Sequence, residues 1–160
     1  KRKLRILVTG ATGFLGGYVI TEALKCEHIV TASGRCKRDS SDNIYHEGLK
    51  WIYKNIVDIS EKDLQGIDAI IHLATAGVSP KVASLRELVQ VNVQGTINLI
   101  EAGILAGVKR YVIAGSFHEY GNSANRYAEI PPDAALEPTS PYAASKAASF
   151  YMVQELTHTQ

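Results

Sequence analysis

The sequence predicts an α/β protein with a doubly wound parallel sheet of five strands, in the order 3-2-1-4-5. Two observations support this fold class. Short apolar segments alternate along the chain with segments of helical periodicity, and the apolar segments are continuous, as in strands that are buried on both faces. Strands that alternate with helices pair in parallel through right-handed crossovers, which gives an open sheet covered on both sides.

Each apolar segment is a predicted strand. The five strands are residues 4–9 (LRILVT), 28–33 (HIVTAS), 49–56, 68–73 (DAIIHL) and 110–114 (RYVIA). Helices are predicted at 14–25, over most of 80–106, and from Pro141 onward, with Ser140 as the candidate N-cap. The stretch 121–141 is rich in Pro, Asn and Ser and is too long for a simple connection, so we expect it to be functional.

Composition describes an ordinary soluble globular domain. The 160 residues are 46% hydrophobic and 21% charged, with a formal net charge of +1. This balance gives no support for a nucleic-acid or membrane-surface partner, and no apolar run is long enough to span a bilayer. Cys26 and Cys36 have no metal-ligand partners at suitable spacing, so no metal site is predicted. We expect free thiols and a cytoplasmic location.

A glycine-rich turn joins the first strand to the first helix. In VTGATGFLGG, Gly10, Gly13 and Gly16 allow backbone to approach a pyrophosphate whose charge meets the N–H groups of the helix. The spacing is GxxGxxG and not the GxGxxG of the standard fingerprint, and tight packing alone is the alternative explanation. In its strand–turn–helix setting the motif predicts dinucleotide binding. The candidate cofactor-binding residues of this turn are Gly10, Thr12, Gly13, Phe14, Leu15 and Gly16.

The sequence TGATGFLG resembles the nucleotide-binding turn of the extended short-chain dehydrogenase/reductase family, which comprises nucleotide-sugar epimerases, dehydratases and reductases. Further motifs follow in the family's order and cover nearly all of the chain: Asp58 in NIVDIS, HLATAG at 72–77, Asn92 in VNVQGT, Ser116 in AGSFHEYG, and YAASK at 142–146. The resemblance implies a Rossmann-type NAD(P)-binding domain over residues 1–160 and a nucleotide-sugar substrate. The chain begins without Met and ends inside a predicted helix, so we expect a piece of a longer protein whose substrate domain lies elsewhere.

The resemblance also assigns residues to the cofactor. Asp58 and Ile59 would contact its adenine end, and Leu73, Ala74 and Thr75 would line its path. For Asp58, a role as N-cap of a helix at 60–65 is an equal alternative.

The end of the second strand indicates which nicotinamide cofactor is used. NAD-selective folds place an acid there that binds the ribose hydroxyls and would repel a 2′-phosphate. Here Gly34 stands in that place and Arg35 follows, with Lys37 and Arg38 close by. A guanidinium suits a phosphate, so NADP(H) is favoured over NAD. A solvated basic loop is the alternative.

Tyr142 and Lys146 form a candidate catalytic pair. Residues four apart on a helix share a face, and a cation within about 4–6 Å stabilises a phenolate. Tyr142 could then exchange a proton with a sugar oxygen, an effect typically worth about 10²–10⁴-fold. Ser116 follows the fifth strand at its carboxyl end, where open α/β sheets bind ligands. In the family resembled, Ser116, Tyr142 and Lys146 take these roles, and the lysine also binds the nicotinamide ribose.

Asn92 lies within the predicted helix 80–106, where Asn has poor propensity. The resemblance implies a local disturbance of the helix that carries water toward the lysine, so Asn92 joins the candidate cofactor-site residues. A solvent-facing Asn is the alternative.

The residues after Ser116 bear on the reaction. Family members that dehydrate sugars carry an acid pair there, whereas this chain has Phe117 and His118, which argues against a 4,6-dehydratase. His118 is a candidate second proton donor or a surface side chain, and Glu119, one place later, is expected to point elsewhere. We therefore expect an NADP(H)-dependent keto-sugar reductase. The alternatives are an NAD-dependent nucleotide-sugar 4-epimerase and a dinucleotide-binding module without turnover. The helices at 82–106 and 141–158 could form a homodimer face.

Overall fold

The computed structural model describes residues 2–35, 49–78 and 82–158. The strands are β1 (Arg5–Thr9), β2 (Ile29–Gly34), β3 (Lys50–Tyr53), β4 (Ala69–His72) and β5 (Arg110–Ile113). The helices are α1 (Phe14–Lys25), α2 (Leu85–Leu88), the π-helix η3 (Val89–Gln94), α3 (Gly95–Leu105) and α4 (Pro141–His158), with 3₁₀ turns η1 (Ile56–Asp58), η2 (Glu61–Leu64), η4 (Phe117–Glu119) and η5 (Asn122–Arg126). Among these described helices, none is long and apolar enough to cross a membrane.

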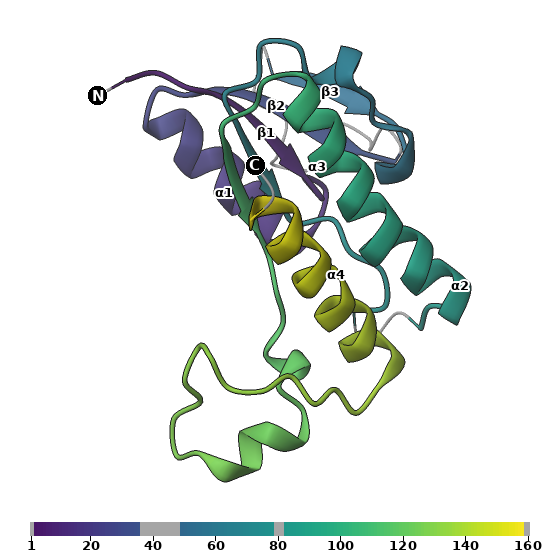
Figure 1. The fold of residues 1–160 in the computed structure, drawn as a ribbon. Helices are drawn as coiled ribbons and strands as arrows, with labels where there is room; N and C mark the ends of the chain where they lie inside the picture. Colours follow the sequence, from purple (N-terminus) through teal and green to yellow (C-terminus); the bar gives the residue numbers. More distant parts are fainter. Residues whose placement is uncertain (1, 36–48, 79–81, 159–160) are drawn as a thin grey trace. The chain divides into compact units, whose positions relative to one another are not determined.

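The chain forms two compact units. One contains Lys1–Ala74 and Asn98–Ala114, and the other contains Thr75–Ile97 and Gly115–Gln160. The first unit holds all five strands, and the second holds α4 with the turns η4 and η5 (Figure 1).

The sheet of the first unit is parallel throughout and has the strand order β3-β2-β1-β4-β5, so the predicted fold class and order are confirmed. In the register of the central strands, Thr9 lies opposite both Ser33 and His72. The carboxyl ends of β1, β2 and β4 therefore lie side by side. The glycine-rich turn follows β1, the middle strand of the three.

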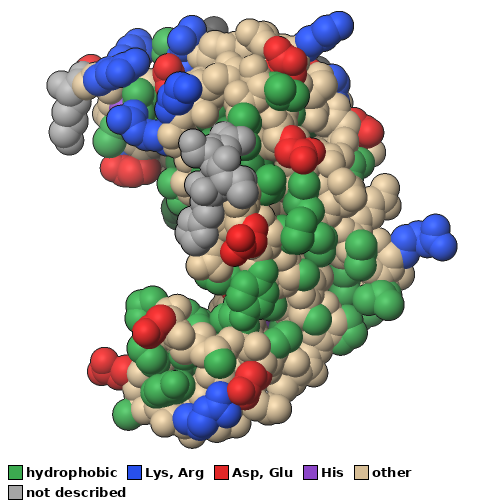
Figure 2. Space-filling view, in the orientation of Figure 1, with side chains coloured by type: hydrophobic (Ala, Val, Ile, Leu, Met, Phe, Trp, Pro, Cys, Tyr) green, Lys and Arg blue, Asp and Glu red, His purple; other side chains and the backbone are tan. Residues whose placement is uncertain are grey.

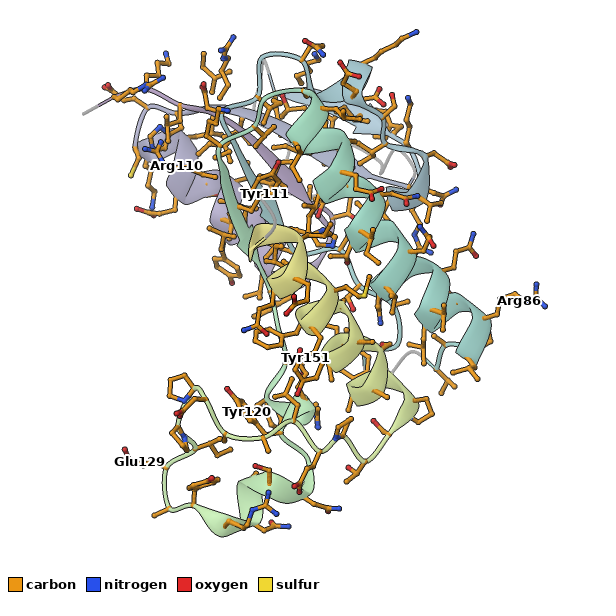
Figure 3. All side chains as sticks on the ribbon, viewed as in Figure 1. Arg86, Arg110, Tyr111, Tyr120, Glu129 and Tyr151 are labelled. Carbon is orange, nitrogen blue, oxygen red and sulfur yellow. The ribbon has the colours of Figure 1, made fainter. Side chains whose placement is uncertain are left out.

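Both faces of this sheet are covered, as a doubly wound fold requires. Ile6, Val8, Val30 and Ala32 pack with Ile20 of α1 in one buried cluster. Leu7 and Ile70 alternate with that set and are fully buried. A Cβ added at Gly103 of α3 would lie 3.1 Å from Ile70 Cδ1, so α3 covers this second face. Figure 3 labels Tyr111 of β5, whose hydroxyl would lie 2.6 Å from the same added Cβ.

Most of the predicted helix 80–106 is confirmed, although residues 82–84 are not helical and the middle is a π-helix. The described part begins at Leu85, where the Ser84 side chain accepts a hydrogen bond from the Glu87 N–H at 3.2 Å. A π-helical segment then runs from Val89 to Gln94 before α3 begins. A three-to-four-residue hydrophobic period does not distinguish a π-helical turn from an α-helical one, so the period alone does not locate this segment.

The last helix was predicted correctly at its start. It begins at Pro141, and the Ser140 hydroxyl accepts a hydrogen bond from the Ala143 N–H at 3.2 Å, which confirms the N-cap. Hydrophobic side chains remain exposed over α4 and over the α2–η3 segment (Figure 2). They are Phe150, Tyr151 and Met152 on α4, and Val82, Leu85 and Val89 at the other segment.

The expected loop 121–141 is folded upon itself. Gly121 and Glu137 form a parallel bridge, and Arg126 pairs with the Glu137 carboxylate at 2.7 Å. The Tyr120 hydroxyl donates to the Pro132 carbonyl at 3.2 Å, which places Tyr120 at the base of this loop (Figure 3). These contacts give the segment a defined course between η4 and α4.

Candidate functional site

Two glycines of the turn in the first unit are packed too closely to carry side chains. A Cβ added at Gly10 would lie 2.7 Å from the Ala74 nitrogen, and one added at Gly16 would lie 2.5 Å from the Gly10 carbonyl oxygen. The Gly13 N–H donates to the Gly10 carbonyl at 2.9 Å, which closes the turn. The tight-packing explanation for these glycines is therefore correct, and it is compatible with a role in binding phosphate.

This turn leads directly into the N-terminus of α1. Gly13 is the N-cap residue, and no side chain caps the first N–H groups of the helix. Such groups carry partial positive charge and are suited to a phosphate. Phe14 and Leu15 in the first turn are exposed, with 83% and 55% of their surface accessible.

A buried pair, Thr9 and His72, holds the segment that packs against the glycine-rich turn. Thr9 Oγ1 lies 2.6 Å from His72 Nδ1, and it accepts the N–H groups of Leu73 and Ala74 at 3.2 and 3.3 Å. Because the hydroxyl already accepts twice, it donates its proton to Nδ1, which leaves the imidazole proton on Nε2. The pair thus holds the first residues of the HLATAG segment at the end of β4, beside Gly10.

The candidate residues for the adenine end also belong to the first unit. Gly34 ends β2, and a Cβ added there would lie 3.2 Å from Thr12 Cγ2, so the end of β2 adjoins the glycine-rich turn. Arg35 follows and is exposed. Lys37 and Arg38 lie outside the described residues.

The alternative role for Asp58 is wrong. Asp58 closes η1 and is exposed, whereas η2 is capped by Ser60 through a capping box with Asp63. The next residue, Ile59, is buried.

Asn92 is a buried residue whose side chain makes several hydrogen bonds within the second unit. It is 1% exposed, so the solvent-facing alternative is wrong, and it lies inside the π-helical segment, which confirms the expected helix disturbance. Its Oδ1 accepts from the Ala76 N–H at 2.7 Å and from the Thr75 hydroxyl at 3.0 Å. Its Nδ2 donates to the Ala76 carbonyl at 3.1 Å and to Ser145 Oγ at 2.9 Å. Asn92 therefore ties residues 75–76 and α4 to one point.

Tyr142 and Lys146 lie one turn apart on α4. Ser145, between them, donates to the Tyr142 carbonyl at 2.7 Å while it accepts from Asn92. Tyr142 is half-buried, and Lys146 is only 5% exposed. A Cβ added at Gly77 would lie 3.3 Å from the Tyr142 ring, so the same loop that Asn92 holds also packs against the tyrosine.

The turn η4 brings Ser116 and His118 to α4, which it contacts. The Ser116 Oγ accepts from the His118 N–H at 3.3 Å, so its own proton is free to be donated. The His118 ring lies edge-on to the Tyr142 ring, with a centroid distance of 6.2 Å, and lies tilted against the Phe117 ring at 4.1 Å. The second unit thus brings together the candidates Thr75, Asn92, Ser116, Tyr142 and Lys146 with His118.

Glu119 is not expected to share the direction of His118, and its carboxylate is buried against the backbone of Ser116. Its side chain is 6% exposed, and its Oε1 accepts the Ser116 N–H at 2.7 Å. The S-x-x-E spacing of Ser116 and Glu119 is the sequence signal of a capping box, which could have revealed this contact.

The two buried charges of the site affect each other. Burial lowers the pKa of Lys146, and the Glu119 carboxylate acts in the opposite direction. Burial raises the pKa of Glu119, while the Ser116 N–H and Lys146 act to lower it. In both groups the effect of burial prevails. The pKa of Lys146 is therefore lowered and that of Glu119 is raised, and each shift favours the neutral form.

The chain is similar to known proteins over nearly all of its length. A family model described as the NAD dependent epimerase/dehydratase family matches residues 6–160. The dTDP-D-glucose 4,6-dehydratase of Mus musculus is 31% identical over 94% of this chain and 45% of its own length. The UDP-glucose 4-epimerase of Mycolicibacterium smegmatis is 31% identical over 91% of this chain and 49% of its own length.

Solved structures agree with these matches. The Bordetella bronchiseptica enzyme WbmG, in complex with NAD and UDP, has a TM-score of 0.83 and 28% identity, and the match covers 96% of this chain and 50% of that chain. The chain spans about half the length of the relatives that it matches.

Proposed function

Because the chain belongs to the NAD dependent epimerase/dehydratase family, we propose that the whole protein is an NADP(H)-dependent oxidoreductase that reduces a nucleotide-linked keto sugar. The observation that carries this proposal is the group of Ser116, Tyr142 and Lys146 around α4 in the second unit. It combines a hydroxyl donor, an acid and a buried cation, which together suit proton transfer to a carbonyl oxygen.

The first unit has residues that fit the cofactor. Side chains at Gly10 and Gly16 would collide with neighbouring backbone, and the N-terminus of α1 has no side-chain cap. Gly10, Gly13 and Gly16, with Thr12, Phe14 and Leu15, would hold the pyrophosphate there. When bound, a reduced nicotinamide supplies a hydride.

The protein's own residues supply the rest of the reaction. Ser116 Oγ donates a hydrogen bond to the keto oxygen, and Tyr142 gives that oxygen its phenolic proton as the carbonyl carbon gains the hydride. The product is an alcohol, and the phenolate left behind is stabilised by Lys146 until it recovers a proton from water. Asn92 fixes α4 against the loop at Thr75 and Ala76, so that the pair keeps its position.

The preference for NADP(H) rests on the end of β2. Gly34 adjoins the glycine-rich turn where an acid would bind the ribose of NAD, and the exposed Arg35 follows it. A titration with NADPH and NADH tests this part. We expect tighter binding of NADPH and a selective loss of that affinity in Arg35→Ala, with exposed Lys54→Ala as the control. Tighter binding of NADH would contradict the preference.

A second candidate is a nucleotide-sugar 4-epimerase that uses NAD. Two findings favour it: the similarity to UDP-glucose 4-epimerases, and the NAD in the complex of WbmG. The 4,6-dehydratase activity of the mouse relative has less support from the residues, because Phe117 and His118 occupy the places of the acid pair. The position of His118 beside Tyr142 suits a second proton donor in either favoured reaction.

One experiment separates these activities. The whole protein is incubated with NADPH or NADH and nucleotide-linked keto sugars, and the absorbance of the reduced cofactor is followed. Net oxidation of NADPH supports the reductase, whereas interconversion of 4-epimers without net redox supports the epimerase. Tyr142→Phe should lower turnover by about 10²–10⁴-fold with little change in cofactor affinity, and unchanged turnover would reject the assigned proton donor.

We also propose that two copies associate through the helices at 82–106 and 141–158. The exposed Leu85, Val89 and Phe150 support this interface, because solvent-facing apolar side chains of this size favour association. Sedimentation of the whole protein tests it, and a Leu85→Glu variant should shift a dimer toward monomer.

A further inference from the structure

We propose that Glu119 is a positioning residue of the site: its carboxylate keeps Lys146 charged and, through the Ser116 backbone, fixes the catalytic hydroxyl. This inference rests on the proposed function of Ser116, Tyr142 and Lys146. Glu119 itself touches neither substrate nor cofactor in this scheme, and it acts through the two residues beside it.

The geometry of η4 carries the positioning half of the proposal. Glu119 Oε1 accepts the Ser116 N–H at 2.7 Å, while Ser116 Oγ accepts the His118 N–H at 3.3 Å. A Cβ added at Gly115 would lie 3.4 Å from the same Oε1, so the carboxylate lies against the backbone of residues 115–116. These two bonds fix both the backbone N–H and the hydroxyl of Ser116.

The charge of Lys146 carries the other half. Lys146 is 5% exposed, and a lysine buried this deeply tends to lose its proton. A neutral amine cannot stabilise the Tyr142 phenolate. Lys146 lies on α4, which the η3 segment and the η4 turn both contact, and the Glu119 carboxylate of η4 acts on it electrostatically. Among the groups that act on the Lys146 pKa, the Glu119 carboxylate raises it against the effect of burial.

The two halves depend on one another. Glu119 is buried as well, and the Ser116 N–H and Lys146 are what favour its ionised form. A carboxylate that accepts a backbone N–H and faces a cation is held in one place. The backbone of the catalytic serine therefore helps to stabilise the anion that keeps the lysine charged.

Glu119→Gln in the whole protein isolates the charge. The amide oxygen of Gln still accepts the Ser116 N–H, so the capping box and the shape remain while the charge is lost. Glu129→Gln is the matched control, because Glu129 lies in the same unit on the exposed loop (Figure 3). Glu119→Asp keeps the charge and serves as the second variant should Gln fail to fold.

The decisive measurement is the pKa of Lys146, from NMR of isotopically labelled lysine with the signal assigned by Lys146→Arg. We expect this pKa to be lower in Glu119→Gln than in wild type and unchanged in Glu129→Gln and Glu119→Asp. An equal Lys146 pKa in wild type and Glu119→Gln would overturn the proposal. This readout needs no substrate, so it is independent of whether the proposed reaction is correct.

Kinetics provide the second readout. The limb of the pH–kcat profile at which activity is lost on deprotonation of Lys146 should move to lower pH in Glu119→Gln and stay in place in Glu129→Gln. A profile that does not move, with the Lys146 pKa lowered, would overturn the catalytic part of the proposal. If no keto sugar is turned over by wild type, the proposed function fails while the NMR result still decides the charge coupling.

Discussion

Replacing Gly10 with alanine should destabilise the protein more than any other single substitution in the glycine-rich turn. Gly10 has a φ of +65°, and the left-handed region costs an L-residue about 1–2 kcal/mol. The new Cβ would lie 2.7 Å from the Ala74 nitrogen and 2.7 Å from the Leu73 carbonyl carbon. Overpacking of this kind costs about 1–3 kcal/mol. The two contributions lower the free energy of unfolding by about 2–5 kcal/mol in total.

Two further variants separate these contributions. Gly107 has a φ of +82°, but an added Cβ would meet nothing within 4 Å, so Gly107→Ala carries the backbone cost alone, about 1–2 kcal/mol. Gly16 lies in α1 outside the left-handed region, and its added Cβ would lie 2.5 Å from the Gly10 carbonyl oxygen. Gly16→Ala therefore carries the steric cost alone, about 1–3 kcal/mol.

Urea unfolding of the whole protein, followed by far-ultraviolet circular dichroism, measures all three free energies. Gly10→Ala should lose about as much as the other two variants combined, because it incurs both costs. Equal midpoints and slopes for Gly10→Ala and Gly107→Ala would refute the reasoning. That result would mean that the backbone at Leu73 and Ala74 does not confine position 10.

Three other predictions concern buried polar groups and pH. Asn92→Leu should lower the free energy of unfolding by at least about 1–3 kcal/mol in urea, since it leaves the buried groups of Ala76 unpaired, whereas exposed Gln90→Ala should change it by less than about 0.5 kcal/mol. Thr9→Val should speed amide hydrogen exchange at Ala74, and Thr9→Ser should not, because it keeps the hydroxyl that accepts this amide. Burial raises the pKa of Asp63, but hydrogen bonds from Lys54 and Ser60 outweigh it, so the net pKa is lowered. A carboxyl group whose pKa is lowered in the folded state stabilises the fold at pH values above its ordinary pKa. Asp63→Asn should therefore lower the free energy of unfolding at pH 7. The difference in this free energy between the variant and wild type should narrow as the pH falls below about 4.

The sheet could be predicted from the sequence because its signal is local and strong. Each strand lies in a short, mainly apolar segment, as expected for strands that are buried on both faces. The alternation of strands and helices then fixes parallel pairing, and the bounds of α1 follow from Phe14 after the glycine turn. The π-helical segment could not be located in this way, although the poor helix propensity of Asn92 pointed to its place.

The site was predicted only in part, and two of the missing residues share a physical reason. Thr9 and His72 act through a contact that exists only once β1 and β4 are in register. Neither residue carries a pattern along the chain that announces it. Glu119 differs, because its S-x-x-E spacing with Ser116 was visible in the sequence. Glu119 is not among the predicted site residues, because the comparison with sugar dehydratases concerns only positions 117 and 118. That comparison takes no account of a buried cation on α4.

The two kinds of contact around α4 affect the site differently. Ser116 is oriented by bonds to residues two and three places later, so its geometry forms with one short turn and tolerates movement elsewhere. Asn92 joins segments that are 16 and 53 residues away, so its bonds form only when the unit has assembled. Substitutions in the η4 turn should therefore change the chemistry before they change stability. Substitutions at Asn92 should change stability first, because the same side chain holds both the loop at Ala76 and the helix that carries Tyr142 and Lys146.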